Sequence, residues 1–243
     1  MNTTSGVPWL TILALLPTLG AVVVLLVRSS AAKVVALATS LLTVVLAVVL
    51  TVGLQPGGGM QLVEDAVWIR PLGAHYALGL DGIGATLVLL ASIVTPVVVL
   101  ATWGDYDRDL PAGARRPAGE PARYDSKIFY ALVLAVQTCA LYLFLATDVF
   151  LFYVFFEVVL VPMYFLIGGF GPGLRRSNAA AKFLIFGLLG GFVMLASVIG
   201  LYVVSADSGR PSFLLTDLAA LDIDDEARSS LTRLAHAVTD RRS

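Results

Sequence analysis

Six long apolar stretches constrain the fold of this chain more than any other feature. A hydrocarbon core about 30 Å thick needs about 20 helical residues to cross it. Six stretches reach that length, and each is a continuous run rather than the alternating pattern of a transmembrane β-strand. They cover residues 7–27, 34–54, 82–103, 128–146, 149–170 and 179–204. The sequence therefore predicts an all-α integral membrane protein with about six transmembrane helices.

Composition supports a lipid environment and argues against several function classes. Charged residues make up 14% of the 243 residues, hydrophobic residues make up 58%, and the mean hydropathy is +0.88. The net charge of −1 gives no basic surface for nucleic acid, so no nucleic-acid partner is expected. Cys139 is the single cysteine, and the two histidines, His75 and His236, are far apart. We therefore expect no disulfide, no metal site and no redox centre on this chain.

The connections between the spans differ in character. Residues 28–33 form a short predicted loop, whereas residues 55–81 open with Pro and Gly and favour a short hairpin. Residues 105–127 carry charges and prolines and predict an irregular surface loop. Residues 1–204 thus form a six-span region, followed by a polar external segment at 205–243. One face of that segment predicts a short amphipathic helix through Ala227, Leu231, Leu234, Ala235 and Val238.

Lys and Arg near the span ends predict the orientation, because cytoplasmic loops carry an excess of both. The basic residues cluster in the first, third and fifth connections, while the second has only Arg70 and the fourth has none. The odd-numbered connections are therefore predicted to face the cytoplasm. This orientation places the N-terminus outside the cell.

Glu157 is the one acidic residue that lies far from both ends of a predicted span. It stands nine residues after Asp148, which at 1.5 Å per residue puts it about 13 Å deep, near the midplane. Pro162 follows one turn later and leaves the carbonyl of Val158 without its helical partner. An ionisable residue at this depth indicates a proton or ion path, although a static buried hydrogen bond between helices is the plain alternative.

Lys182 and Gln137 are the other candidate site residues. Lys182 lies near the start of the last span, where a lysine can simply extend toward lipid headgroups. An antiparallel hairpin puts it level with Leu166 and about 13 Å from Glu157, too far for direct contact. Gln137 shares the depth of Glu157 on the neighbouring span, so a hydrogen bond between them is possible, and contact with another helix is an equal alternative.

Three further polar residues are predicted to have structural roles. Asp81 and Asp148 each stand at a helix start, where a carboxylate accepts backbone amide bonds and suits the positive end of the helix dipole. His75 is predicted to add only surface polarity to an external loop.

Several of these stretches resemble a known family. They are residues 78–83 before the third span, residues 146–168 through Glu157 and Pro162, and residues 179–186 around Lys182. They resemble subunit M of NADH-quinone oxidoreductase (respiratory complex I), within the antiporter-like proton-channel family. The resemblance covers essentially the whole chain, and Glu-x-x-Leu-x-Pro-Met-Tyr-Phe-Leu-Ile from Glu157 favours subunit M.

The resemblance implies a function, partners and a location. Such subunits carry protons through a hydrated midplane path, with quinone and NADH used elsewhere in the complex and no cofactor on this chain. The family's glutamate falls on Glu157, and its Lys-Phe pair falls on Lys182 and Phe183. We expect other membrane subunits and lipid as partners in a bacterial-type plasma membrane. Family members have further spans in inverted repeats, so this chain would be the N-terminal part of a larger bundle, with a seventh span expected beyond Ser243.

Two other functions remain open from the sequence. Related subunits of multisubunit cation/proton antiporters share the fold and the span-five glutamate, so a subunit of such a complex is the alternative. A chain truncated at this length would instead serve as a helical scaffold, and loss of Glu157 would then leave its assembly and its complex unaffected.

Overall fold

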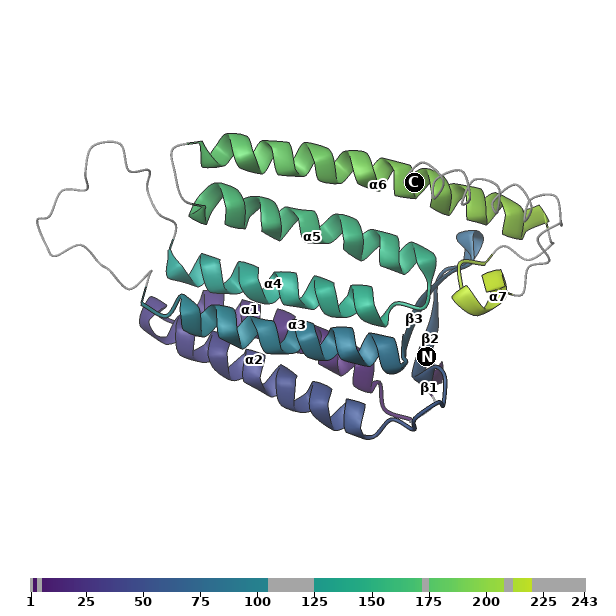
Figure 1. The fold of residues 1–243 in the computed structure, drawn as a ribbon, viewed down its shortest axis with the longest axis horizontal. Helices are drawn as coiled ribbons and strands as arrows, with labels where there is room; N and C mark the ends of the chain where they lie inside the picture. Colours follow the sequence, from purple (N-terminus) through teal and green to yellow (C-terminus); the bar gives the residue numbers. More distant parts are fainter. Residues whose placement is uncertain (1, 4–5, 105–124, 172–174, 208–211, 220–243) are drawn as a thin grey trace, which may run out of the picture.

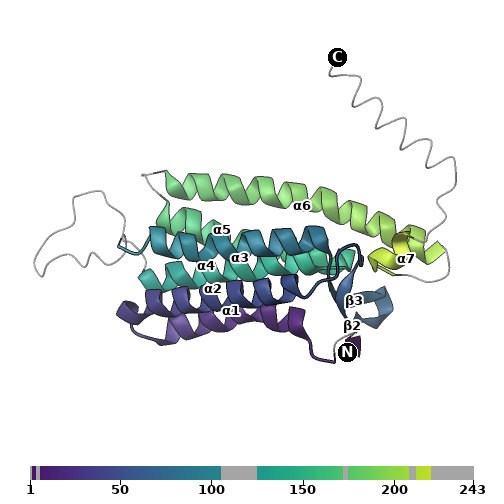
Figure 2. The ribbon, with the colours of Figure 1, turned by 60° about the horizontal axis from the view of Figure 1, so that its bottom comes forward.

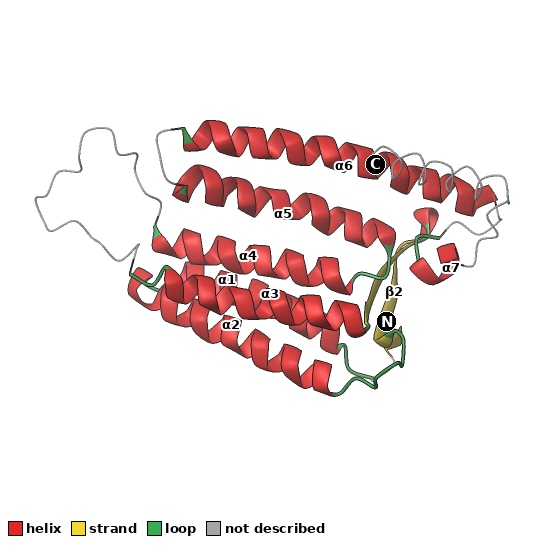
Figure 3. Ribbon diagram, in the orientation of Figure 1, coloured by secondary structure: helices red, strands yellow, loops and turns green. Residues whose placement is uncertain are grey.

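Six long helices run side by side in this computed structural model, which describes residues 2–3, 6–104, 125–171, 175–207 and 212–219 (Figures 1 and 3). All six are long and apolar enough to cross a membrane. They are α1 (Trp9–Leu26), α2 (Ser29–Val52), α3 (Gly82–Ala101), α4 (Ser126–Leu145), α5 (Val149–Phe170) and α6 (Arg176–Asp207). The predicted six-span, all-α membrane fold is confirmed.

The predicted loop at residues 28–33 is wrong, because α2 already begins at Ser29. Lys33 therefore lies in the second turn of a membrane helix, and its Nζ lies 5.1 Å from the centre of the Trp103 ring. A lysine can extend its alkyl chain along an apolar surface and place its charge over an aromatic face, so the helix tolerates the charge there.

The predicted hairpin between the second and third spans is confirmed. Strand β2 (Gln61–Ile69) pairs antiparallel with β3 (Ala74–Leu80), and the short strand β1 (Asn2–Thr3) pairs with the other edge of β2. A single 3₁₀ turn, η1 (Arg70–Leu72), joins the two longer strands and ends at Gly73, whose φ of 63° favours glycine. The small sheet lies across one end of the helix bundle (Figure 1).

The turn between α4 and α5 extends this sheet, which the sequence did not predict. Thr147 donates its backbone N–H to the carbonyl of Ala77 (3.0 Å), and its own carbonyl accepts from Leu215 N (3.0 Å). Val149 N donates to the carbonyl of Phe213 (2.9 Å). The start of α5 is thus held between β3 and the segment that follows α6.

Asp81 and Asp148 are helix caps, as predicted. Asp81 Oδ1 accepts from Gly84 N (2.6 Å), and Asp148 Oδ1 accepts from Leu151 N (2.9 Å). Asp148 also accepts from His75 N through Oδ2 (2.9 Å), so its carboxylate joins α5 to the hairpin. Burial raises the pKa of Asp148, and the backbone hydrogen bonds from His75 and Leu151 oppose that rise.

The prediction that His75 adds only surface polarity is wrong. Its Nδ1 lies 2.6 Å from Oδ1 of Asp65 on the neighbouring strand, and its side chain is 21% exposed. The cross-strand pair arises because Val67 and His75 are opposite each other in the hairpin, which brings Asp65 close on the same face.

Burial is unequal across the bundle. Helix α4 is the most buried of the six, with 61% of the residues in its most apolar stretch buried inside the bundle. The corresponding share in α6 is 11%, and α6 lies at the edge of the bundle against α5 (Figures 1 and 2). The short helix α7 (Leu215–Ala219) lies near the hairpin end. The amphipathic helix predicted through Ala227 and Val238 lies outside the described residues.

Candidate functional site at the interface of α5 and α6

Glu157 occupies the middle of α5. The cap at Asp148 fixes the start of the helix, and nine residues of helical rise then place Glu157 about 13 Å from that end. Its Oε1 is buried and has no hydrogen-bond partner among the residues that the structure describes. An unpaired carboxyl oxygen in the apolar part of a bundle is costly, which makes Glu157 the candidate site residue of α5.

Glycines on α6 allow the two helices to approach each other closely. A Cβ built on Gly187 would lie 2.8 Å from Cδ2 of Leu160, and one built on Gly191 would overlap Oε1 of Glu157 and lie 2.6 Å from its Cδ. Nearer the other end of the interface, a Cβ on Gly168 would lie 3.3 Å from Cβ of Ala180. Gly187 and Gly191 are four residues apart, so both lie on the face of α6 that packs against α5.

These contacts place Lys182 opposite Leu166, because the pairs Gly168–Ala180 and Glu157–Gly191 fix an antiparallel register. Lys182 is exposed and lies nine residues, or about 13 Å, along the axis from the level of Glu157. The two side chains are therefore too far apart for an ion pair, which agrees with the register predicted from the sequence.

Gln137 is buried in α4, with a residue exposure of 2%, and neither atom of its amide has a hydrogen-bond partner in the described residues. Tyr142 of the same helix stacks on Phe155 of α5, with 4.0 Å between ring centres. Phe155 and Glu157 are two residues apart and point to roughly opposite sides of α5. The structure thus contains no direct hydrogen bond between Gln137 and Glu157, and their approach at the midplane stays a prediction.

Sequence reasoning missed one buried acid, Glu64 of β2, which is 1% exposed. Its carboxylate caps the start of α1: Oε1 accepts from Leu10 N (2.7 Å), and Oε2 accepts from Thr11 N (3.1 Å) and Thr11 Oγ1 (2.5 Å). Pro8, at the cap position itself, has no side chain that can accept these bonds. A strand residue far along the chain therefore performs the capping.

A line of hydroxyl groups continues from Glu64 into the bundle. Thr11 Oγ1 lies 2.8 Å from the Tyr76 hydroxyl, which lies 3.3 Å from the Tyr142 hydroxyl. Because Thr11 donates its proton to the carboxylate, Tyr76 donates to Thr11 and Tyr142 donates to Tyr76. Burial raises the pKa of Tyr76, although its hydrogen bonds to Thr11 and Tyr142 oppose the rise, so the phenol stays a donor.

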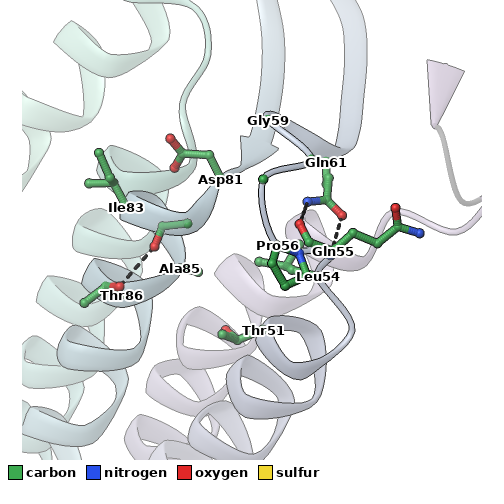
Figure 4. A pocket seen from close by; sticks show the side chains of 13 residues that line it. Thr51, Leu54, Gln55, Pro56, Gly59, Gln61, Asp81, Ile83, Ala85 and Thr86 are labelled. Carbon is green, nitrogen blue, oxygen red and sulfur yellow. Dashed lines mark hydrogen bonds between the residues drawn. The ribbon is translucent and has the colours of Figure 1, made fainter.

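A crevice of about 500 Å³ opens between the end of α2 and the start of α3, at the hairpin end of the bundle (Figure 4). Asp81 in its wall accepts from Gly84 N, and the amide of Gln61 pairs with the backbone of Gln55 (Figure 4), whereas the hydroxyl of Thr51 has no partner among the described residues. It contains none of the three predicted site residues. Within the described residues, no group of three or more histidine, cysteine, aspartate or glutamate side chains is arranged to bind a metal ion.

Comparison with known proteins places this chain in a family. Residues 146–234 match the family described as NADH:quinone oxidoreductase/Mrp antiporter, TM. NADH-quinone oxidoreductase subunit M of Mycobacterium tuberculosis is 43% identical over 229 residues, which cover 86% of this chain and 41% of that protein. This chain belongs to the NADH:quinone oxidoreductase/Mrp antiporter family. It spans about 41% of the length of that relative.

More distant relatives and solved structures extend the comparison. F(420)H(2) dehydrogenase subunit M of Methanosarcina mazei is 34% identical over 162 residues, covering 66% of this chain and 29% of that protein. A chain of respiratory complex I from Thermus thermophilus superposes with a TM-score of 0.71 at 26% identity, covering 90% of this chain and 40% of that one. A chain of the Mrp complex from Dietzia shares the fold, with a TM-score of 0.65 at 19% identity, over 87% and 21% of the two chains. The stretch that matches the family, residues 146–234, therefore includes α5 with Glu157 and the part of α6 with Gly191.

Proposed function

We propose that this multi-pass chain is a membrane subunit of a proton-translocating NADH-quinone oxidoreductase and that Glu157 carries the proton at the membrane midplane. The observation that carries the proposal is the buried, unpaired Oε1 of Glu157 in the middle of α5. Intramembrane acids without a static partner serve proton and ion paths. The 43% identity to a subunit M supports assignment to this enzyme complex, with other membrane subunits as partners.

The proposed path is hydrated. Buried polar groups almost always have a partner, and neither the Gln137 amide nor Oε1 of Glu157 has one within the described residues. Water along α5 at the midplane satisfies both groups and supplies the link to Lys182, which protein contacts alone do not span. Lys182 then tunes proton entry from the cytoplasmic side, because its charge lies between the solvent and the acid.

The proposed orientation puts the N-terminus outside a bacterial plasma membrane. Strand β1 and the hairpin lie at one end of the bundle, and the end of α3 and the start of α4 lie at the other (Figure 1). The basic residues Arg28, Lys33, Arg175 and Arg176 gather at the end opposite the hairpin. An excess of positive charge marks the cytoplasmic side.

The test is proton pumping and NADH-quinone turnover in membranes that hold normal amounts of the assembled complex. Glu157→Gln keeps the size of the side chain but cannot release a proton, so coupled turnover is expected to fall strongly while assembly is unchanged. Glu157→Asp serves as the graded control and retains part of the activity. Undiminished pumping by Glu157→Gln would leave Glu157 as a structural residue and the chain as a scaffold.

A second candidate function is a subunit of a cation/proton antiporter complex. The shared fold with a chain of the Mrp complex favours keeping it, and the matched family includes both kinds of complex. Co-purification decides between them, because the chain would be recovered with NADH-oxidising activity in one case and with sodium/proton exchange activity in the other.

A further inference from the structure

The glycines of α6 differ in what surrounds them. Gly191 is buried, and the position that a Cβ would occupy there is filled by the carboxyl group of Glu157. Gly187, one turn away on the same face, meets only the apolar Leu160. Gly190 is exposed, and a Cβ built on it meets nothing within 4 Å. One short segment therefore contains a glycine that contacts the acid, one that contacts apolar packing and one that contacts neither.

We propose that Gly191 is a positioning residue for Glu157: its missing side chain leaves the space in which the carboxyl group lies against α6. The inference rests on the proposed role of Glu157 as the proton carrier. It adds that the location of the acid is determined by a residue on the neighbouring helix.

A methyl group at position 191 would displace the carboxyl group of Glu157. A Cβ on Gly191 would overlap Oε1 and lie 2.6 Å from Cδ of Glu157, both closer than nonbonded atoms approach. Glu157 Oε1 has no hydrogen bond that holds it in place, so the carboxyl group is the part that moves. Val158 and Val161, beside it on α5, are exposed, so displacement takes the carboxyl out of the interface with α6.

Close helix packing alone does not account for this arrangement. Leu160 against Gly187 is an apolar contact of the kind that small residues permit in any membrane helix pair. At Gly191 the missing side chain makes room for an ionisable group instead. The position of such a group matters, because misplacing a reacting group by about 1 Å can lower a rate by as much as about 100-fold. The two glycines therefore have separable roles, and Gly187 provides the packing control.

The test uses the assembled complex in native membranes and the variants Gly191→Ala, Gly187→Ala and Gly190→Ala. A lipid-soluble carbodiimide reacts with protonated carboxyl groups, and its attachment to Glu157 is measured by mass spectrometry at fixed pH. We expect a severalfold faster reaction in Gly191→Ala and rates close to the parent protein in the other two. An unchanged rate in Gly191→Ala, or an equal rise in Gly187→Ala, would overturn the proposal.

A second variant keeps the test decisive if Gly191→Ala does not accumulate. Glu157→Asp is one methylene shorter and makes room for the added methyl group, so the double variant Gly191→Ala/Glu157→Asp should assemble to the level of Glu157→Asp alone. Failure of that rescue also contradicts the proposal. Because carbodiimide labelling does not depend on pumping, it tests the position of Glu157 even if Glu157→Gln shows that the acid carries no proton.

Discussion

Glu64 offers the sharpest test of how the hairpin stabilises the bundle. Its carboxylate accepts three hydrogen bonds from Leu10 and Thr11, and Leu10 is fully buried. Glu64→Ala leaves the backbone N–H groups of Leu10 and Thr11 without an acceptor. Glu64→Gln keeps one acceptor oxygen, and its amide nitrogen can donate to Thr11 Oγ1 but cannot accept from a backbone N–H.

The magnitude follows from these contacts. Leaving one buried N–H unsatisfied costs about 1–3 kcal/mol, and Glu64→Ala leaves the N–H groups of Leu10 and Thr11 in that state. We therefore expect Glu64→Ala to lose about 3 kcal/mol of stability and Glu64→Gln about half of that. For a chain of this size, each kcal/mol lowers the midpoint of thermal unfolding by about 2–4 °C, so Glu64→Ala should melt about 6–12 °C lower.

The sole cysteine provides the assay. Cys139 is 5% exposed in the folded chain, so a dye that fluoresces on reaction with a thiol reports its exposure when the detergent-solubilised protein is heated. Asp65→Asn is the matched control, because Asp65 is the next residue of β2 and its partly exposed pair with His75 contributes about 0–1 kcal/mol. Equal melting of Glu64→Ala and Asp65→Asn would refute the capping argument.

Three further predictions concern topology and the proposed path. In a chain with Cys139 replaced, cysteines introduced at Asn2 and Gly113 should label from opposite sides of the membrane. Gly113 lies outside the described residues. Labelling of both cysteines from one side would contradict the orientation. Lys182→Ala should lower proton pumping partly while Lys182→Arg retains most of it, and full activity in both would show that the lysine only extends toward headgroups. Gln137→Leu removes two buried, unpartnered polar atoms, so the thermal midpoint should stay level or rise while pumping falls; unchanged pumping would remove Gln137 from the path.

The six spans and the caps at Asp81 and Asp148 were predictable because their causes are local. A run of about 20 apolar residues needs a membrane whatever lies beside it, and an aspartate at a helix start accepts the amides that follow it. The depth of Glu157 follows from helical rise alone, and its separation from Lys182 follows once the fifth and sixth spans are taken as an antiparallel hairpin. The sequence determined these features from the spans and their order along the chain.

Contacts between distant parts of the chain were decided only by the tertiary structure. Glu64 lies 54 residues from the backbone N–H of Leu10 that it caps, and no local pattern joins the two. The carboxyl group of Glu157 lies against α6, where Gly191 leaves room for it. Hydrophobicity fixed which segments enter the membrane, whereas the shapes of the side chains fixed which helices pair and where the acid lies between them.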